Sequence, residues 1–202
     1  MKLYYSPGAC SLGPHIVLNE LGLAHEVEKV DLAAKKTEKG ADYWQINPKG
    51  YVPAIATDDG QLVTEAANVL QYLADKKPEA NLLPKPGTME RTRAVEWLTF
   101  ISTELHKGYS PLFRPTTPDA YKTIVRENLA KRLAYVDKQL SGKKYLLGDN
   151  FSVADAYLFN ILRWSKFTQV DLSPYANINA YFERVQARPK VQETLKQEGL
   201  LK

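Results

Sequence analysis

The single cysteine, Cys10, stands where a short predicted strand at 2–5 gives way to an amphipathic helix that begins near Ser11. A thiol at a helix N-terminus faces backbone N–H groups and the positive end of the helix dipole, which lowers its pKa from about 8.5 into the range of about 3.5–7.5. This placement predicts a reactive, thiolate-rich sulfur. The alternative is that a lone cysteine packs as a small buried hydrophobic residue.

The residues after Cys10 do not supply a second sulfur. Ser11, Leu12 and Gly13 fill the positions where a dithiol oxidoreductase carries Cys-x-x-Cys. Without a resolving cysteine, a redox cycle has to use an external thiol, and glutathione is the obvious candidate.

Two further segments could bind such a ligand. Val52-Pro53 follows a loop and opens a predicted strand, where a cis-proline would shape a backbone edge that pairs with a peptide ligand. An ordinary loop proline is the alternative. Glu65-Ala66 lies between a strand and a helix, so backbone N–H groups there can bind a carboxylate, and the Glu65 side chain can pair with an ammonium group. A surface glutamate that caps the helix is the alternative at this position.

The elements that position these residues fall into two groups. Periodicity predicts strands at 2–5, 25–32, 52–57 and 61–64 and helices at 11–21 and 66–76, the order of a thioredoxin-like layer with a four-stranded sheet. A proline-rich linker covers 78–87. Helical periodicity then recurs at 89–106, 120–140, 153–167, 178–186 and 191–198. The predicted fold class is therefore α/β plus all-α, with domains at 1–80 and 88–202.

One predicted helix start and one predicted helix face stand out. Ser152, with Asp155 three residues later, forms a variant of the capping box ahead of the apolar helix at 153–167. On the helix at 89–106, the core stripe contains Val95, Leu98, Ile101 and Leu105. A second, polar face contains Thr99, Thr103, His106 and Lys107, at i, i+4, i+7 and i+8.

The side chains of the second group suggest two further roles. A histidine such as His106 beside a sulfur could donate a hydrogen bond to it or move a proton at neutral pH. A cation that caps the helix C-terminus is the alternative. Phe113, Tyr157 and Trp164 could line an apolar pocket, or they could simply belong to the core.

The composition is that of an ordinary globular protein. The 202 residues, 44% hydrophobic and 25% charged, suffice to bury a core without disulfides. No apolar run approaches the ~18 residues of a membrane span, and the first residues lack a signal-peptide core, so we expect a cytoplasmic protein without membrane contact. The scattered net charge of +4 disfavours nucleic acid as a partner. The three histidines lack metal-ligand spacing, so no metal is expected.

Six short motifs together resemble the bacterial beta class of cytosolic glutathione transferases. They are Cys10-Ser11, Asn47-Pro48-Lys49-Gly50, Val52-Pro53, Leu62-Val63-Thr64-Glu65, Glu104-Leu105-His106-Lys107-Gly108 and Phe151-Ser152-Val153-Ala154-Asp155-Ala156-Tyr157. Their order and domain context extend the resemblance over the full length. It implies a homodimer, in which each subunit pairs an N-terminal thioredoxin-like glutathione-binding domain with a C-terminal all-helical glutathione-transferase domain that supplies an electrophile pocket.

The resemblance also implies roles for individual residues. Cys10 and His106 are the expected catalytic residues. The expected glutathione contacts are Cys10, Lys35, Val52, Pro53, Glu65, Ala66, His106 and Lys107, together with Thr99, Thr103 and Glu104, which are expected to act from the partner subunit. Relatives often have asparagine where this chain has Thr99, and Ala66 can offer only its backbone N–H. Phe113, Tyr157 and Trp164 are the candidates for the electrophile pocket.

The resemblance thus implies an enzyme, a glutathione transferase that conjugates reduced glutathione to small hydrophobic electrophiles in detoxification. Glutathione-dependent reduction of disulfides or peroxides through Cys10 is a second expected chemistry. No cofactor beyond glutathione as co-substrate is expected. A non-catalytic protein that keeps this fold for binding or regulation is the alternative.

Overall fold

The computed structural model describes residues 1–201. They divide into two compact units, Met1–Asn81 with the segment that begins at Arg188, and Leu82–Ala187. The first of these divisions falls within the 78–87 segment, and the second, after Ala187, has no counterpart in the predicted 88–202 domain. Helical periodicity predicts a helix at 191–198 but does not show which element it packs against, and by its contacts this segment groups with the first unit.

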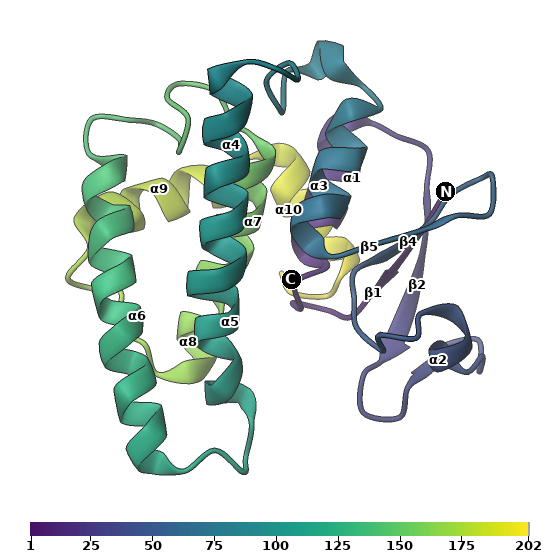
Figure 1. The fold of residues 1–202 in the computed structure, drawn as a ribbon, viewed down its shortest axis with the longest axis horizontal. Coiled ribbons are helices and arrows are strands. Elements are labelled where there is room, and N and C mark those ends of the chain that lie inside the picture. The colour runs from purple at the N-terminus through teal and green to yellow at the C-terminus, as the bar shows by residue number, and fades with distance from the viewer. Residues whose placement is uncertain (202) are drawn as a thin grey trace. The chain divides into compact units, whose positions relative to one another are not determined.

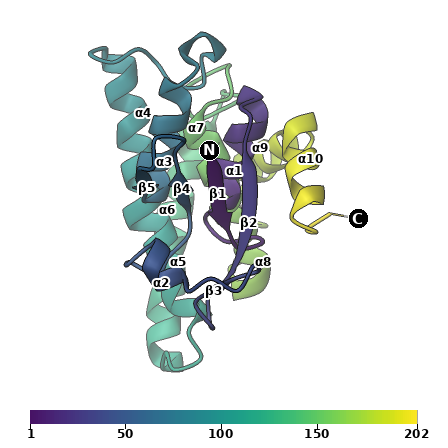
Figure 2. The same cartoon turned by 90° about the vertical axis from the view of Figure 1, so that its right-hand side faces the viewer.

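The first unit is built on a mixed sheet with the strand order β3-β2-β1-β4-β5 (Figure 2). The strands are β1 (Lys2–Tyr5), β2 (Glu26–Asp31), β3 (Lys36–Thr37), β4 (Ala54–Ala56) and β5 (Leu62–Thr64). β1 and β2 are parallel, and the other pairs are antiparallel. The four strands predicted from periodicity are present. β3 is an addition, because two residues are too few to show a period.

Alternation along the strands gives the sheet two buried faces. On one face, Tyr4 packs against Tyr43 of the short helix α2 (Tyr43–Ile46), with ring centroids 5.7 Å apart. Leu3 and Ile55, which are fully buried register partners on β1 and β4, fall on the opposite face. There, α1 (Leu12–Leu21) packs against α3 (Ala66–Asp75), and Figure 1 shows the two helices together beside the sheet.

The last helix, α10 (Pro189–Gln197), packs against α1 and belongs to the first unit. Just before it, Arg188 donates from Nε and Nη2 to the two carboxylate oxygens of Glu20, at 2.8 and 2.9 Å. Just after it, the buried Glu198 accepts from the Gly8 backbone N–H and contacts Nδ1 of His15, both at 2.9 Å. Arg188 and Glu198 therefore contact both α1 and the loop that precedes it.

The second unit is helical. Its α-helices are α4 (Met89–Phe100), α5 (Lys107–Tyr109), α6 (Asp119–Leu140), α7 (Val153–Arg163), α8 (Ser165–Thr168) and α9 (Ala176–Gln186), and a π-helical turn, η2 (Ile101–His106), joins α4 to α5. α7 is buried from Val153 to Leu162 and contacts α4, η2 and α9, so it forms the centre of the unit. None of the helices within residues 1–201 is both long and apolar enough to cross a membrane.

The start of α7 is fixed by the predicted capping box between Ser152 and Asp155. The Asp155 carboxylate accepts from the Ser152 N–H at 2.8 Å, from the Ser152 hydroxyl at 2.6 Å and from the Leu146 N–H at 2.9 Å. Complete burial raises the pKa of Asp155 from 3.8 to about 6, against the lowering effect of these hydrogen bonds.

Candidate functional site

In the first unit, the segment 47–53 is held rigidly before strand β4. The buried Asn47 amide and the Tyr43 hydroxyl both donate to the Tyr51 carbonyl oxygen, at 2.7 and 2.8 Å. Burial raises the pKa of Tyr43 to about 12, which keeps its hydroxyl a donor. Gly50 has φ +65°, and a Cβ there would lie 2.6 Å from the Trp44 ring, so only glycine fits.

Cys10 reaches this segment directly. Its thiol donates to the Val52 carbonyl oxygen at 3.0 Å, and the Val52-Pro53 peptide bond is cis. Ser11 does not cap α1, because its hydroxyl accepts from the Ser6 N–H at 3.1 Å and donates to the Ser6 carbonyl at 3.2 Å. The serine therefore closes the loop that carries Cys10 and leaves the N-terminus of α1 without a side-chain cap beside the sulfur.

Lys35 reaches the same segment from the loop after β2. Its ammonium donates to the Gly50 carbonyl at 2.9 Å and lies over the rings of Trp44 and Tyr51, 5.3 and 5.9 Å from their centroids. The Lys35 backbone has φ +54°, an uncommon conformation for a residue with a Cβ. The rings of Trp44 and Tyr51 and the Gly50 carbonyl thus hold the Lys35 ammonium beside the segment 47–53.

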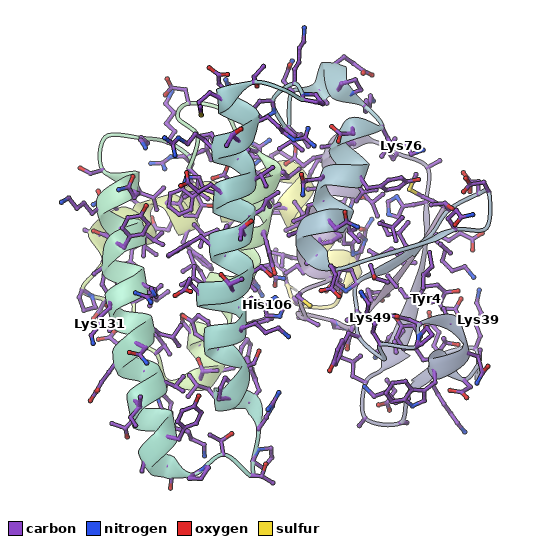
Figure 3. The ribbon with its side chains drawn as sticks, in the orientation of Figure 1. Tyr4, Lys39, Lys49, Lys76, His106 and Lys131 are labelled. Carbon is purple, nitrogen blue, oxygen red and sulfur yellow. The ribbon has the colours of Figure 1, made fainter. Side chains whose placement is uncertain are left out.

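Glu65 lies at the N-terminus of α3 and is tied to the segment through Lys49, which Figure 3 labels. The Lys49 ammonium donates to the Glu65 carboxylate at 2.8 Å and to the Thr64 hydroxyl at 3.0 Å. Glu65 has φ +68° and ψ +119°, a strained backbone for a non-glycine residue. The next residue, Ala66, is buried and opens the helix, so its backbone N–H belongs to the positive end of the α3 dipole.

The first unit therefore brings together all the site residues predicted within it. A thiol, an ammonium, and a helix N-terminus with a carboxylate are each linked to the segment 47–53 by one polar side-chain contact. Such a set suits an extended peptide-like ligand that carries a thiol, an amino group and carboxylates. Sequence reasoning did not identify Lys49 as the partner of Glu65, although Lys49 stands within the quoted motif 47–50.

In the second unit, the polar face predicted on the helix at 89–106 is engaged locally. The hydroxyls of Thr99 and Thr103 donate to the main-chain carbonyls four residues earlier, at 2.9 and 3.1 Å. Glu104 accepts from Arg132 of α6 at 2.6 Å. Lys107 is exposed at the start of α5. The predicted core stripe is largely confirmed, with Leu98, Ile101 and Leu105 fully buried, but sequence reasoning missed the π-helical turn within it.

His106 ends that π-helical turn (Figure 3) and is partly buried by aromatic side chains. Its Nδ1 lies 2.7 Å from the Tyr157 hydroxyl oxygen. Its ring meets those of Tyr157 and Trp164 edge-on, with centroids 5.9 and 5.0 Å away. A neutral imidazole held in this way can donate or accept through its other nitrogen.

The three aromatic residues predicted for an electrophile pocket differ greatly in exposure. Phe113 is 48% exposed and packs edge-on against Trp164, with centroids 5.3 Å apart. Trp164 is 8% exposed and Tyr157 only 1%. Phe113 therefore offers the largest surface of the three. Across residues 1–201, no three histidine, cysteine, aspartate or glutamate side chains are grouped as a metal site would require.

Comparisons with known proteins agree with this architecture. Residues 8–76 match the family model of the glutathione S-transferase N-terminal domain, and residues 100–189 match that of the C-terminal domain. The chain is 48% identical to glutathione S-transferase GstA of Escherichia coli O157:H7, over 99% of this chain and 100% of that protein.

Solved structures are similar over the same extent. A sphingomonad glutathione S-transferase complexed with glutathione has a TM-score of 0.96 at 44% identity, covering 99% of this chain and 100% of that one. A bacterial beta-class glutathione S-transferase of Sphingomonas chungbukensis has a TM-score of 0.96 at 46% identity, with full coverage of both chains. These matches confirm the predicted fold class, and the chain belongs to the bacterial beta-class glutathione S-transferases, a family of glutathione transferase enzymes.

Proposed function

We propose that the chain binds reduced glutathione along the segment 47–53, with the cysteinyl backbone of the ligand paired with Val52. Cys10, Lys35 and Glu65 all contact this one segment, and this convergence is the observation that carries the proposal. The γ-glutamyl end lies toward Glu65 and Ala66, where the carboxylate meets helix N–H groups and Glu65 binds the ammonium. Lys35 supplies a cation for the other carboxylate, and the ligand sulfur lies near Cys10.

Conjugation is the first proposed reaction. The glutathione thiolate attacks a small hydrophobic electrophile, a bond forms from sulfur to carbon, and the leaving group departs with its electron pair. The protein binds the thiolate, lowers its proton affinity and excludes water. Phe113 and Trp164 supply an apolar surface for the electrophile, and the buried Tyr157 adds little to it.

Glutathione-dependent reduction through Cys10 is the second proposed reaction. The Cys10 thiolate attacks a disulfide that contains glutathione, releases the other thiol as thiolate, and becomes a mixed disulfide with glutathione. A second glutathione thiolate then attacks the glutathione sulfur of that mixed disulfide, which regenerates Cys10 and releases oxidised glutathione. The chain has one cysteine, so the second thiol comes from the ligand.

The remaining predicted contacts belong to the same proposal. His106 and Lys107, with Pro53, are proposed as glutathione contacts, and Thr99, Thr103 and Glu104 are proposed to act from the partner subunit of a homodimer. The proposed compartment is the cytoplasm, where reduced glutathione is available and a single thiol stays reduced. Glutathione is the only co-substrate in this scheme.

Intact mass and turnover test the proposal together. After exposure to oxidised glutathione, the protein should gain the mass of one glutathionyl group, and Cys10→Ala should gain none. Cys10→Ala should abolish disulfide reduction, because Cys10 is the only cysteine in the sequence and the variant has no thiol left. It should retain part of the conjugation activity, whose nucleophile is the sulfur of glutathione itself. Equal losses in kcat/KM for both reactions would contradict this division.

A non-catalytic binding protein is the competing function. It would bind glutathione with measurable affinity in calorimetry and turn over neither electrophiles nor disulfides. The thiol beside the uncapped α1 N-terminus favours the enzyme, because a protein that only binds has no need of an accessible sulfur at that position.

A further inference from the structure

A buried tyrosine contacts His106 within the second unit. Tyr157 is 1% exposed and lies on α7, whose residues from Val153 to Leu162 are all buried. Its hydroxyl oxygen is 2.7 Å from His106 Nδ1, and Trp164 meets the imidazole edge-on at 5.0 Å. A side chain on the most buried helix of the unit has little freedom to move, so Tyr157 supplies a fixed partner to the histidine on η2.

The two groups differ in how well they donate and accept. A phenol oxygen shares its lone pair with the ring and is a weak acceptor, whereas its O–H is a good donor. The unprotonated nitrogen of a neutral imidazole is a strong acceptor. At 2.7 Å, the favoured arrangement is therefore the Tyr157 hydroxyl donating to Nδ1, with the imidazole proton on Nε2.

We propose that Tyr157 is a positioning residue that holds neutral His106 in the tautomer with its proton on Nε2. The nitrogen that acts on a ligand is then an N–H donor, and His106 supports a thiolate by donating a hydrogen bond to it instead of removing its proton. A hydrogen bond to the charged form of an acid favours that form. The use of this donor at the glutathione sulfur rests on the proposed function, whereas the tautomer does not.

Protonation of His106 fits the same geometry. The imidazolium takes its extra proton at Nδ1, and the Tyr157 hydroxyl turns to accept from the new N–H. The heavy atoms stay where they are, and no proton leaves the phenol. The pair therefore keeps one hydrogen bond in both charge states, while Nε2 remains a donor in both.

The imidazole ¹⁵N spectrum of the full-length protein tests the tautomer directly. The chain has three histidines, and the signals lost in His106→Ala identify those of His106. In the neutral imidazole, Nδ1 should show the shift of an unprotonated ring nitrogen and Nε2 that of an N–H. The opposite pattern in the wild-type protein would overturn the proposal without any variant of Tyr157.

Tyr157→Phe and Tyr109→Phe form a matched pair. Tyr109 is also fully buried and also meets Trp164 edge-on, at 6.2 Å, but its hydroxyl bonds to Ser165 at 2.6 Å instead of to His106. Tyr157→Phe should convert the His106 signals to those of a tautomer mixture, and Tyr109→Phe should leave them unchanged. The same change in both variants, or in neither, would show that the hydroxyl of Tyr157 does not set the tautomer.

A double-mutant cycle extends the test to activity. Tyr157→Phe should lower kcat/KM for conjugation about tenfold when His106 is present, less than the ~10²-fold loss expected for His106→Ala. It should produce no further loss in the His106→Ala background, because its effect passes through the imidazole. Additive losses would overturn the positioning role. A correct ¹⁵N pattern without any turnover would instead contradict the proposed function and leave the tautomer assignment standing.

Discussion

Glu65 combines backbone strain with a side chain in the proposed glutathione site. Its φ of +68° and ψ of +119° are disfavoured for any residue with a Cβ, and it still occupies the junction that opens α3. Its carboxylate, 67% exposed, pairs with a Lys49 side chain that is 51% exposed. An ion pair this exposed contributes little to stability, which supports the proposed role of Glu65 in glutathione binding.

Replacing Glu65 by glycine should therefore stabilise the protein while weakening glutathione binding. Relief of the strained conformation is worth about 1 kcal/mol, because glycine adopts positive φ without a steric penalty. The urea midpoint should rise, and the KM for glutathione should rise with it. Glu65→Ala is the control, since it removes the same carboxylate but keeps the strain. A gain in stability in both variants would show that the backbone is not the cause.

Asp155 should make the stability of the protein depend on pH in an unusual direction. Burial raises its pKa in the folded state from 3.8 to about 6, so the folded state binds its proton more tightly than the unfolded chain. The stability contributed by this group is fully present below about pH 4 and is lost as the pH rises through 6. Over this window, the free energy of unfolding of wild type should fall by about 3 kcal/mol relative to that of Asp155→Asn.

Asp171→Asn is the matched control for that prediction. Hydrogen bonds from the backbone and the hydroxyl of Ser173 lower the pKa of the exposed Asp171, so its contribution has the opposite sign and is lost as the pH falls. Urea midpoints at pH 4 and pH 7 for the three proteins provide the comparison. Parallel pH profiles for wild type and Asp155→Asn would refute the raised pKa.

At the scale of elements, α7 depends on how its first turn is closed. Ser152 donates its hydroxyl to the Asp155 carboxylate and is itself 4% exposed. The predicted helix start is confirmed, and besides its part in the capping box the hydroxyl donates to the carboxylate that completes it. Loss of the Ser152 hydroxyl would remove one of the hydrogen bonds that the fully buried Asp155 carboxylate accepts.

Ser152→Ala should lower the free energy of unfolding by about 2 kcal/mol, at the upper end of the range of about 0.5–2 kcal/mol for helix caps. Thr88→Ala, at the partly exposed start of α4, removes a cap to the Arg91 N–H and should lie near the lower end. Chemical denaturation of both variants gives the comparison. An equal loss in the two would mean that burial of the carboxylate does not add to the cap.

The sequence predicts the elements well where a period is long enough to be read. α6 at Asp119–Leu140 and α3 at Ala66–Asp75 lie within one residue of the predicted ranges. Periodicity assumes one helix type, so the π-helical turn η2 inside the predicted 89–106 helix could not be found. The four residues of α2 are also too few to show a helical period.

Local patterns can indicate some residues of the proposed site and not others. Cys10 and Glu65 are recognisable because they lie at junctions between a strand and a helix, and such junctions can be located from local patterns. The contact between His106 and Tyr157 joins residues 51 positions apart, and no local pattern reports it. Tyr157 was therefore predicted from its apolar ring, whereas its hydroxyl is the group that contacts the histidine.

At the scale of the whole molecule, the two units contribute different chemistry. The first carries the thiol and the segment 47–53, and the second carries the imidazole and the aromatic residues Phe113 and Trp164. Since Thr99, Thr103 and Glu104 are proposed to serve a partner subunit, the functional form should contain two chains.

Light scattering should give a mass of about twice 22.8 kDa at micromolar concentration. The expected form is a symmetric homodimer, the closed arrangement that most homo-oligomers adopt. Sedimentation across a dilution series would give the dissociation constant and would show whether conjugation activity falls with the dimer. A monomer that remains active at micromolar concentration would contradict the proposed contribution of the partner.

The return of α10 to the first unit has a consequence for biosynthesis. Ribosomes release the chain from its N-terminus at about 5–20 residues per second. The β-sheet and α1 emerge early, but Glu20, His15 and Gly8 can meet their partners Arg188 and Glu198 only after residues 188–198 have emerged. The helical unit at Leu82–Ala187 is continuous and complete before then. We therefore expect the unit that is made first to complete its contacts, including that of Gly8 in the loop that carries Cys10, only after residues 188–198 have been made.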